Sequence, residues 1–143
     1  MSVGKICTRV VATAHGGENI RVAAERMDAQ NVGTLVVITK DRRPEGILTD
    51  RDVTLRCVAR GRDPDETPVS EVMTRPLRTV RVNTPIEDAL ESMRKGGVRR
   101  LVVVDQDESL VGLLALNDVV DLLVEEVETI GGILRREVPF LRS

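Results

Sequence analysis

Two polar residues near the start of an expected helix have the clearest chemical potential in this sequence. Thr49 ends an apolar stretch, and Asp52 follows three residues later, in the expected first helical turn. A carboxylate accepts hydrogen bonds from neighbouring hydroxyl groups, and charged acceptors form stronger bonds than neutral ones. A threonine hydroxyl beside the free N–H groups of a helix N-terminus can donate to a phosphate. The same spacing is also typical of helix capping, so a purely structural role stays open.

A related constellation stands 66 residues further along the chain, where Asp118 corresponds to Asp52 and Ala115 to Thr49. Because Ala115 has no hydroxyl, we expect this second site to bind more weakly, to prefer a ligand with fewer phosphates, or to stay empty. Arg99 and Arg100 precede an expected strand. Adjacent guanidinium groups can hold a phosphate, although a solvated pair bridged to acidic side chains is the open alternative.

The offset of 66 residues marks a gapless internal repeat that covers roughly residues 10–60 and 76–126. A unit of this size is only marginally stable alone, so the two copies are expected to pack together. The repeat relates Gly46 to Gly112, Leu35-Val36-Val37 to Leu101-Val102-Val103, and Asp52-Val53 to Asp118-Val119.

Hydrophobic periodicity and turn residues predict the order β-α-β-β-α in each copy. Thr84 is expected to cap a helix as part of a capping box with Glu87, with Pro85 in the first helical position. The predicted strands are 11–14, 34–38 and 45–48, then 79–82, 101–104 and 110–114; the predicted helices are 19–30, 50–60, 85–95 and 117–130, and a short helix is expected near 69–73.

Composition excludes several classes of partner. The net charge is −2 and aromatic residues make up 1% of the chain, which argues against nucleic-acid binding. Two cysteines are too few for a disulfide framework, and the apolar run 110–116 is too short to cross a membrane. The first residues lack the apolar core of a signal peptide, so we expect a cytoplasmic protein with no membrane partner.

Catalytic signatures are absent from the sequence. It contains no P-loop, G-x-G-x-x-G or G-x-S-x-G motif, and its single histidine, His15, has no evident ligand spacing to a cysteine. We therefore expect no catalytic residues, no metal site and no enzyme activity.

Three segments resemble the cystathionine-β-synthase (CBS) domain family. They are Gly46-Ile-Leu-Thr-Asp-Arg-Asp52, Val72-Met-Thr-Arg-Pro76 and Leu101-Val-Val-Val-Asp105. The resemblance implies an α/β (α+β) fold of two βαββα repeats packed with pseudo-two-fold symmetry. The expected division is repeat one at 7–60, a polar linker at 61–71, repeat two at 72–130 and a C-terminal tail at 131–143.

The same resemblance implies a regulatory module that binds an adenine nucleotide (AMP, ADP, ATP or a related adenosyl ligand) between the repeats, without an obligatory cofactor. In that family the hydroxyl, carboxylate and arginine positions contact ribose and phosphate. The expected ligand-binding residues are Thr49, Asp52, Arg99, Arg100 and Asp118, with Thr13, Ala14, Val32 and Ile47 lining the base pocket. A homodimer that regulates a partner protein is expected. The alternative is a non-catalytic scaffold with vestigial sites.

One apolar stripe extends beyond the second repeat. Val119, Leu123, Val127, Ile130 and Leu134 share one helical face if the helix continues through Gly131-Gly132. Packing on its own module is the first expectation, and contact with a second subunit is the alternative. The tail segment Val138-Pro-Phe-Leu141 is a further candidate for docking.

Overall fold

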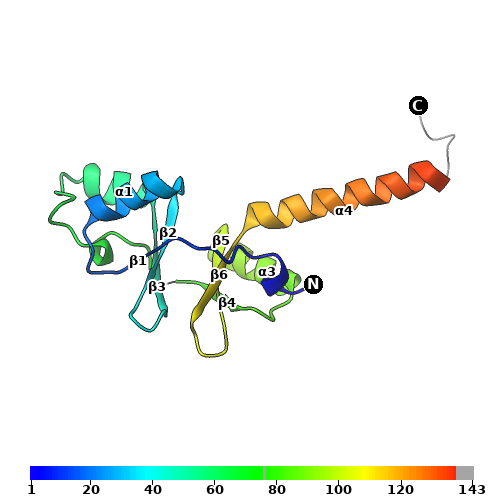
Figure 1. The fold of residues 1–143 in the computed structure, drawn as a ribbon, viewed down its shortest axis with the longest axis horizontal. Helices are drawn as coiled ribbons and strands as arrows, with labels where there is room; N and C mark the ends of the chain where they lie inside the picture. Colours follow the sequence, from blue (N-terminus) through cyan, green and yellow to red (C-terminus); the bar gives the residue numbers. More distant parts are fainter. Residues whose placement is uncertain (76, 138–143) are drawn as a thin grey trace.

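The computed structural model describes residues 1–75 and 77–137, and it contains the predicted β-α-β-β-α order twice. The two repeats form two lobes that lie side by side (Figure 1). The first lobe comprises β1 (Thr13–Ala14), α1 (Ile20–Gln30), β2 (Thr34–Ile38), β3 (Pro44–Thr49), α2 (Asp50–Asp52) and the π-helical η2 (Val53–Val58). The second lobe comprises β4 (Thr79–Arg81), α3 (Ile86–Gly96), β5 (Arg100–Val104), β6 (Leu110–Ala115) and α4 (Leu116–Glu137). Two short 3-10 helices precede them, η1 (Val3–Lys5) before the first lobe and η3 (Val69–Glu71) before the second. The α/β fold class is confirmed.

Each lobe contains one three-stranded sheet, and the two sheets have the same topology. Their strand orders are β1-β2-β3 and β4-β5-β6, with the first pair parallel and the second antiparallel. The register is also equivalent, because Val37 pairs with Gly46 and Val103 pairs with Gly112. The sequence repeat is therefore a structural repeat down to the pairing of single residues.

The two lobes share a core. Each has its own buried cluster, and a third cluster joins β2 to β5 through Val36, Ile38, Val102 and Val104. Val36 and Val102 are equivalent residues, as are Ile38 and Val104, so each sheet uses the same face toward the other. This is the arrangement that a pseudo-two-fold axis produces.

Each lobe is completed by the segment that precedes the other lobe in sequence. Val3 lies in the core of the second lobe, and Thr8 pairs with Leu113. Val69 and Val72 lie in the core of the first lobe, and Thr74 pairs with Ile47. Part of the expected linker is thus buried structure belonging to the first repeat.

These exchanged segments also explain the failure of one predicted cap. The capping box of Thr84 and Glu87 is wrong, because α3 begins at Ile86 and Pro85, in the N-cap position, makes no side-chain bond. The Ile86 N–H instead donates to the Met1 carbonyl at 3.0 Å. The equivalent Ile20 N–H donates to the Thr67 carbonyl at 3.0 Å, so a backbone carbonyl from the exchanged segment serves both helices.

Helix α4 continues past its predicted end at residue 130, through both glycines, to Glu137. It projects away from the lobes as a long arm (Figure 1). Val119 is 3% exposed but Val127 is 68% exposed, so the expectation that the whole stripe packs on its own module is wrong. Residues 138–141 lie outside the described part of the chain. Within 1–75 and 77–137, no helix has the length and apolarity needed to cross a membrane.

Candidate functional site

The carboxylate of Asp52 is the centre of a closed polar network. Its Oδ2 accepts from the Thr49 N–H at 3.0 Å, and the Thr49 hydroxyl accepts from the Asp52 N–H at 3.1 Å. The Thr74 hydroxyl lies 3.1 Å from each carboxylate oxygen, and Arg56 Nε lies 3.8 Å from Oδ1. The capping role expected for Thr49 and Asp52 is present. Asp52 is 9% exposed, so a ligand would have to compete with these partners.

Asp118 occupies the equivalent place in the second lobe with fewer partners. Its Oδ2 accepts from the Ala115 N–H at 3.2 Å, and Ala115 has no hydroxyl to return a bond. Among the described residues, Asp118 has no hydroxyl or guanidinium partner comparable to Thr74 and Arg56. Most of its lone pairs are therefore free to accept bonds from another molecule.

Asp118 faces a cavity of about 280 Å³ that both lobes build. The second lobe contributes the carboxylate of Asp118 and the guanidinium of Arg100 to its walls. The start of β2 and the segment before β1 provide the rest of the lining. Three predicted ligand residues therefore share one cavity: Val32, Arg100 and Asp118. The other lining residues are Thr8, Val10, Val11, Ala12, Gly33, Thr34, Leu113 and Ala115.

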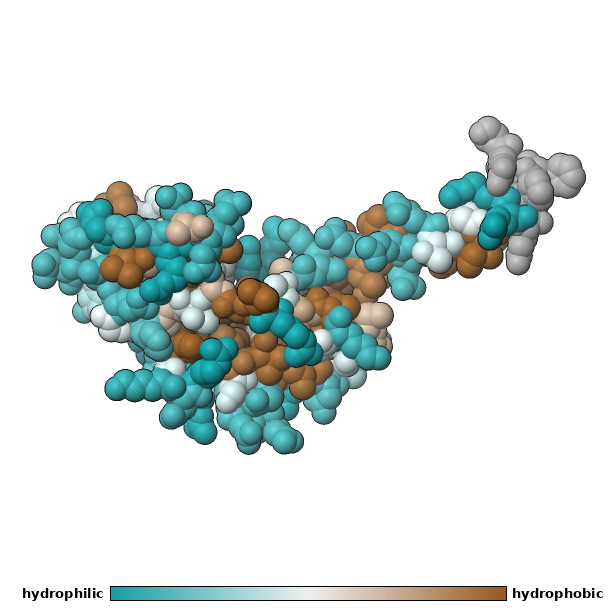
Figure 2. All heavy atoms as spheres, viewed as in Figure 1, coloured by the Kyte–Doolittle hydropathy of each residue, from teal (hydrophilic) through white to brown (hydrophobic). Residues whose placement is uncertain are grey.

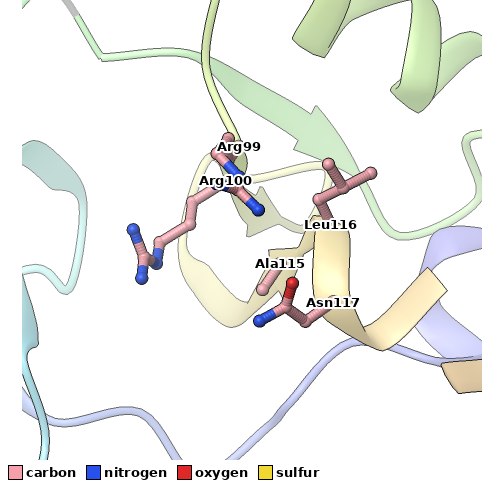
Figure 3. A pocket seen from close by; sticks show the side chains of 5 residues that line it. All are labelled: Arg99, Arg100, Ala115, Leu116 and Asn117. Carbon is pink, nitrogen blue, oxygen red and sulfur yellow. The ribbon is translucent and has the colours of Figure 1, made fainter. Parts of the chain in front are cut away.

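A second cavity of about 190 Å³ adjoins the first at Arg100. Figure 3 shows that the side chains of Arg99 and Arg100 diverge, with Arg100 extending away from Leu116. Neighbouring residues along an extended chain point to opposite sides, so the two guanidiniums do not form one clamp. Both arginines are exposed, as the solvated alternative expected, but in the described part of the chain neither forms an ion pair with an acidic side chain.

The remaining predicted residues lie elsewhere. Thr13 lines a third cavity, and its carbonyl accepts from Arg26 Nη1 at 2.9 Å. Ala14 is buried in the first core, and Ile47 pairs with Thr74 while packing at the contact between the sheets. Thr49, Asp52 and Ile47 are not among the residues that line the two cavities at Arg100. Neither of these cavities therefore brings Thr49, Asp52 and Arg99 together in one site.

A carboxylate–guanidinium pair fixes the loop after β1. Arg26 Nη1 donates to Glu18 Oε1 at 2.9 Å, and the His15 N–H donates to the same oxygen at 2.8 Å. The hydrogen bond from Arg26 lowers the pKa of Glu18 below its usual value, against the opposing effect of burial. The pair therefore stabilises the loop mainly while Glu18 is ionised.

Comparison with known proteins decides the family. The CBS domain model matches residues 3–58 and 69–125, which together cover most of the chain. This chain belongs to the CBS domain family. The CBS domain-containing protein YhcV of Bacillus subtilis is 44% identical over 117 residues, covering 82% of this chain and 81% of YhcV.

A further relative and a solved structure also match most of the chain. An uncharacterised protein of Methanopyrus kandleri, MK0525, is 31% identical over 130 residues, covering 91% of this chain and 66% of that protein. The structure of a CBS domain protein from Pyrobaculum aerophilum complexed with AMP has a TM-score of 0.73 at 30% identity, covering 82% of this chain and 89% of that one. The fold is that of a CBS domain pair.

Sequence reasoning missed Thr74 as a partner of Asp52, and it missed Thr8, Val10 and Val11 as part of the cavity that Asp118 faces. Thr8 and Thr74 are separated by the same 66 residues as the rest of the repeat. Extending the repeat upstream would have identified them as equivalent residues, but not their partners Leu113 and Ile47.

Proposed function

We propose that this CBS pair is a regulatory module that binds an adenine nucleotide in the cavity lined by Asp118, Arg100 and Val32. The observation that carries the proposal is the meeting of a little-used carboxylate and an unpaired guanidinium in a cavity with apolar walls. A ribose offers neighbouring hydroxyls to the carboxylate, a phosphate suits the guanidinium, and a base suits the apolar wall. The AMP complex of the Pyrobaculum aerophilum protein supports the same ligand class.

Each residue has a distinct role in this proposal. Asp118 accepts hydrogen bonds from the ribose hydroxyls, and Arg100 neutralises the phosphate. The first lobe contributes Val32, Gly33 and Thr34 to the opposite wall. Arg99, in the adjoining cavity, is available to a longer phosphate chain such as that of ADP or ATP. Because the walls come from both lobes, bound ligand favours whichever arrangement of the lobes it contacts best.

The equivalent region around Thr49 and Asp52 is proposed as the weaker site. Binding there requires the Thr74 hydroxyl to release the Asp52 carboxylate, which offsets part of any gain from the ligand. Thr13, Ala14 and Ile47 are proposed to support this region through the backbone. Ligand-driven change would pass to a partner protein through a homodimer in the cytoplasm, without catalysis or an obligatory cofactor.

Titration calorimetry with AMP, ADP, ATP and S-adenosylmethionine tests the proposal on the purified protein. Asp118→Asn should weaken binding by about 10- to 100-fold, the range for losing charge-assisted hydrogen bonds. Asp41→Asn, in the exposed turn between β2 and β3, makes the same charge change away from the cavity and should leave the affinity unchanged. Because the chain has no Trp or Tyr, co-purified nucleotide would dominate its absorbance near 260 nm.

Two results would contradict the proposal. Flat titrations across the panel would favour the scaffold alternative with vestigial sites. Strong binding that Asp52→Asn abolishes while Asp118→Asn does not would move the ligand to the region around Thr49.

A further inference from the structure

Helix α4 carries an exposed apolar stripe beyond the second lobe. Its residues are 47–68% exposed, although they are large and aliphatic: Val120, Leu123, Val124, Val127, Ile130 and Leu134. Figure 2 shows apolar side chains along this arm, outside the body of the molecule. Between Val120 and Val127 the stripe is hollowed into a shallow apolar groove, lined also by Leu123, Val124 and Glu128. Exposed contiguous apolar surface of this kind marks an interaction site.

The spacing of the stripe selects a helix as its partner. Val120, Leu123, Val127, Ile130 and Leu134 follow one another at intervals of three, four, three and four residues. That alternation is the a/d pattern of helices that pack along their length, with each side chain fitting between residues of the facing helix. Val124 and Ile133, which are 51% and 52% exposed, flank this seam and broaden the surface that a facing helix would cover. The occupant is therefore a helix with a matching seam.

Charge along α4 favours a second copy of α4 in the opposite direction. Acidic residues occupy the first part of the helix, at Asp118, Asp121, Glu125, Glu126 and Glu128, and Arg135 and Arg136 lie near its end. Parallel pairing would set the acidic parts against each other and the arginines against each other. Antiparallel pairing centred near Val127 sets the arginines of each copy beside Asp118 at the start of the other α4, while Glu126 and Glu128 lie near the centre of the pair.

We infer that two copies of this protein associate through antiparallel packing of their α4 helices, centred on Val127. With this centre, Leu134 of one copy faces Val120 of the other, and the two Val127 side chains meet near the axis. The inference gives a surface to the homodimer of the proposed function, yet it does not depend on the ligand cavity. The arm projects away from the lobes (Figure 1), and Arg100 lies on β5, outside α4.

Sedimentation velocity over a wide concentration range tests the association. The unmodified protein should show a reversible dimer, and Val127→Glu should weaken it at least about 100-fold, because two carboxylates would then be buried facing each other. The matched control is Thr129→Glu, which adds the same charge on the opposite face of the helix. An unmodified protein that stays monomeric overturns the inference. A dimer that Val127→Glu leaves intact also overturns it, since the dimer would then use another surface.

Disulfide trapping tests the direction of pairing. Val120→Cys and Leu134→Cys proteins, each also carrying Cys7→Ser, are mixed and oxidised; Cys57 is buried and stays in place. Antiparallel pairing predicts crossed dimers that join position 120 of one copy to position 134 of the other. Dimers that join only identical positions would show parallel pairing and would overturn the inference. Calorimetry with AMP on the Val127→Glu protein separates the two proposals, because ligand affinity should persist when the dimer is lost.

Discussion

The two lobes place equivalent aspartates in different surroundings. In the first lobe Asp52 is held by a reciprocal capping box and by the Thr74 hydroxyl; in the second, Asp118 has one backbone partner. The sequence differs here at two equivalent positions, Thr49 against Ala115 and Arg56 against Leu122. One fold therefore holds the same residue in a capping network in one repeat and gives it a single backbone partner in the other.

The largest effects on stability should appear when the equivalent glycines of the two lobes, Gly46 and Gly112, are replaced by alanine. A Cβ at Gly112 would lie 2.6 Å from the Thr8 carbonyl oxygen, and a Cβ at Gly46 would lie 2.9 Å from the Thr74 carbonyl oxygen. We expect Gly112→Ala and Gly46→Ala each to lower the free energy of unfolding by about 1–3 kcal/mol, with Gly112→Ala the more severe. Urea unfolding followed by circular dichroism measures both.

Gly17→Ala is the matched control, because a Cβ there would have no neighbour within 4 Å. Equal losses of stability in Gly17→Ala and Gly112→Ala would show that the Thr8 carbonyl does not lie as close to β6 as described.

Exchanging the residue types at positions 49 and 115 should reverse the difference in helix capping between the two lobes. Thr49→Ala removes the acceptor for the Asp52 N–H and should cost about 1 kcal/mol of unfolding free energy. Ala115→Thr supplies the missing acceptor in the second lobe and should add a similar amount or somewhat less. Both changes are measured by the urea midpoint at constant slope. If Ala115→Thr has no effect while Thr49→Ala destabilises, the lobes differ in more than this hydroxyl.

The repeat made much of the architecture predictable from sequence. Aligned apolar strands and the Thr-x-x-Asp cap were expected from local patterns, and the β-α-β-β-α order followed. The exchange of the segments before each repeat was not predictable from sequence, because local patterns identify an element but not the distant surface on which it packs. The same exchange explains why the predicted Thr84 cap is absent, since the Ile86 N–H donates to the Met1 carbonyl instead.

The candidate site was predictable only in part for a related reason. Residue types and spacing identified Asp52, Arg100 and Asp118 as candidates, but their availability depends on tertiary partners. Thr74 lies 22 residues from Asp52, and no periodicity connects them. The divergence of Arg99 and Arg100 follows from strand alternation, which became applicable once β5 was known to begin at Arg100.

The smallest expected difference between the lobes is a pH-dependent contribution to the free energy of unfolding, which comes from an ion pair in the first lobe. Glu18 and Arg26 form an ion pair there, whereas the equivalent residues of the second lobe are Thr84 and Ser92. Because the pKa of Glu18 is lower in the folded protein, the pair stabilises the fold fully above the usual value of 4.5. This stabilisation is lost as the pH falls from there through the lowered folded-state pKa.

Glu18→Gln should therefore lower the free energy of unfolding near neutral pH by less than about 1 kcal/mol, because the pair is partly solvated. The difference between the unmodified and Glu18→Gln proteins should shrink toward zero as the pH falls below that of Glu18 protonation. Thermal unfolding measured from pH 7 to pH 3 follows this difference, with Glu87→Gln in α3 as an exposed control in the other lobe. A difference that grows on acidification would mean that Glu18 is stabilised in its protonated form, and the loop after β1 would then be held by its backbone contacts instead of by Arg26.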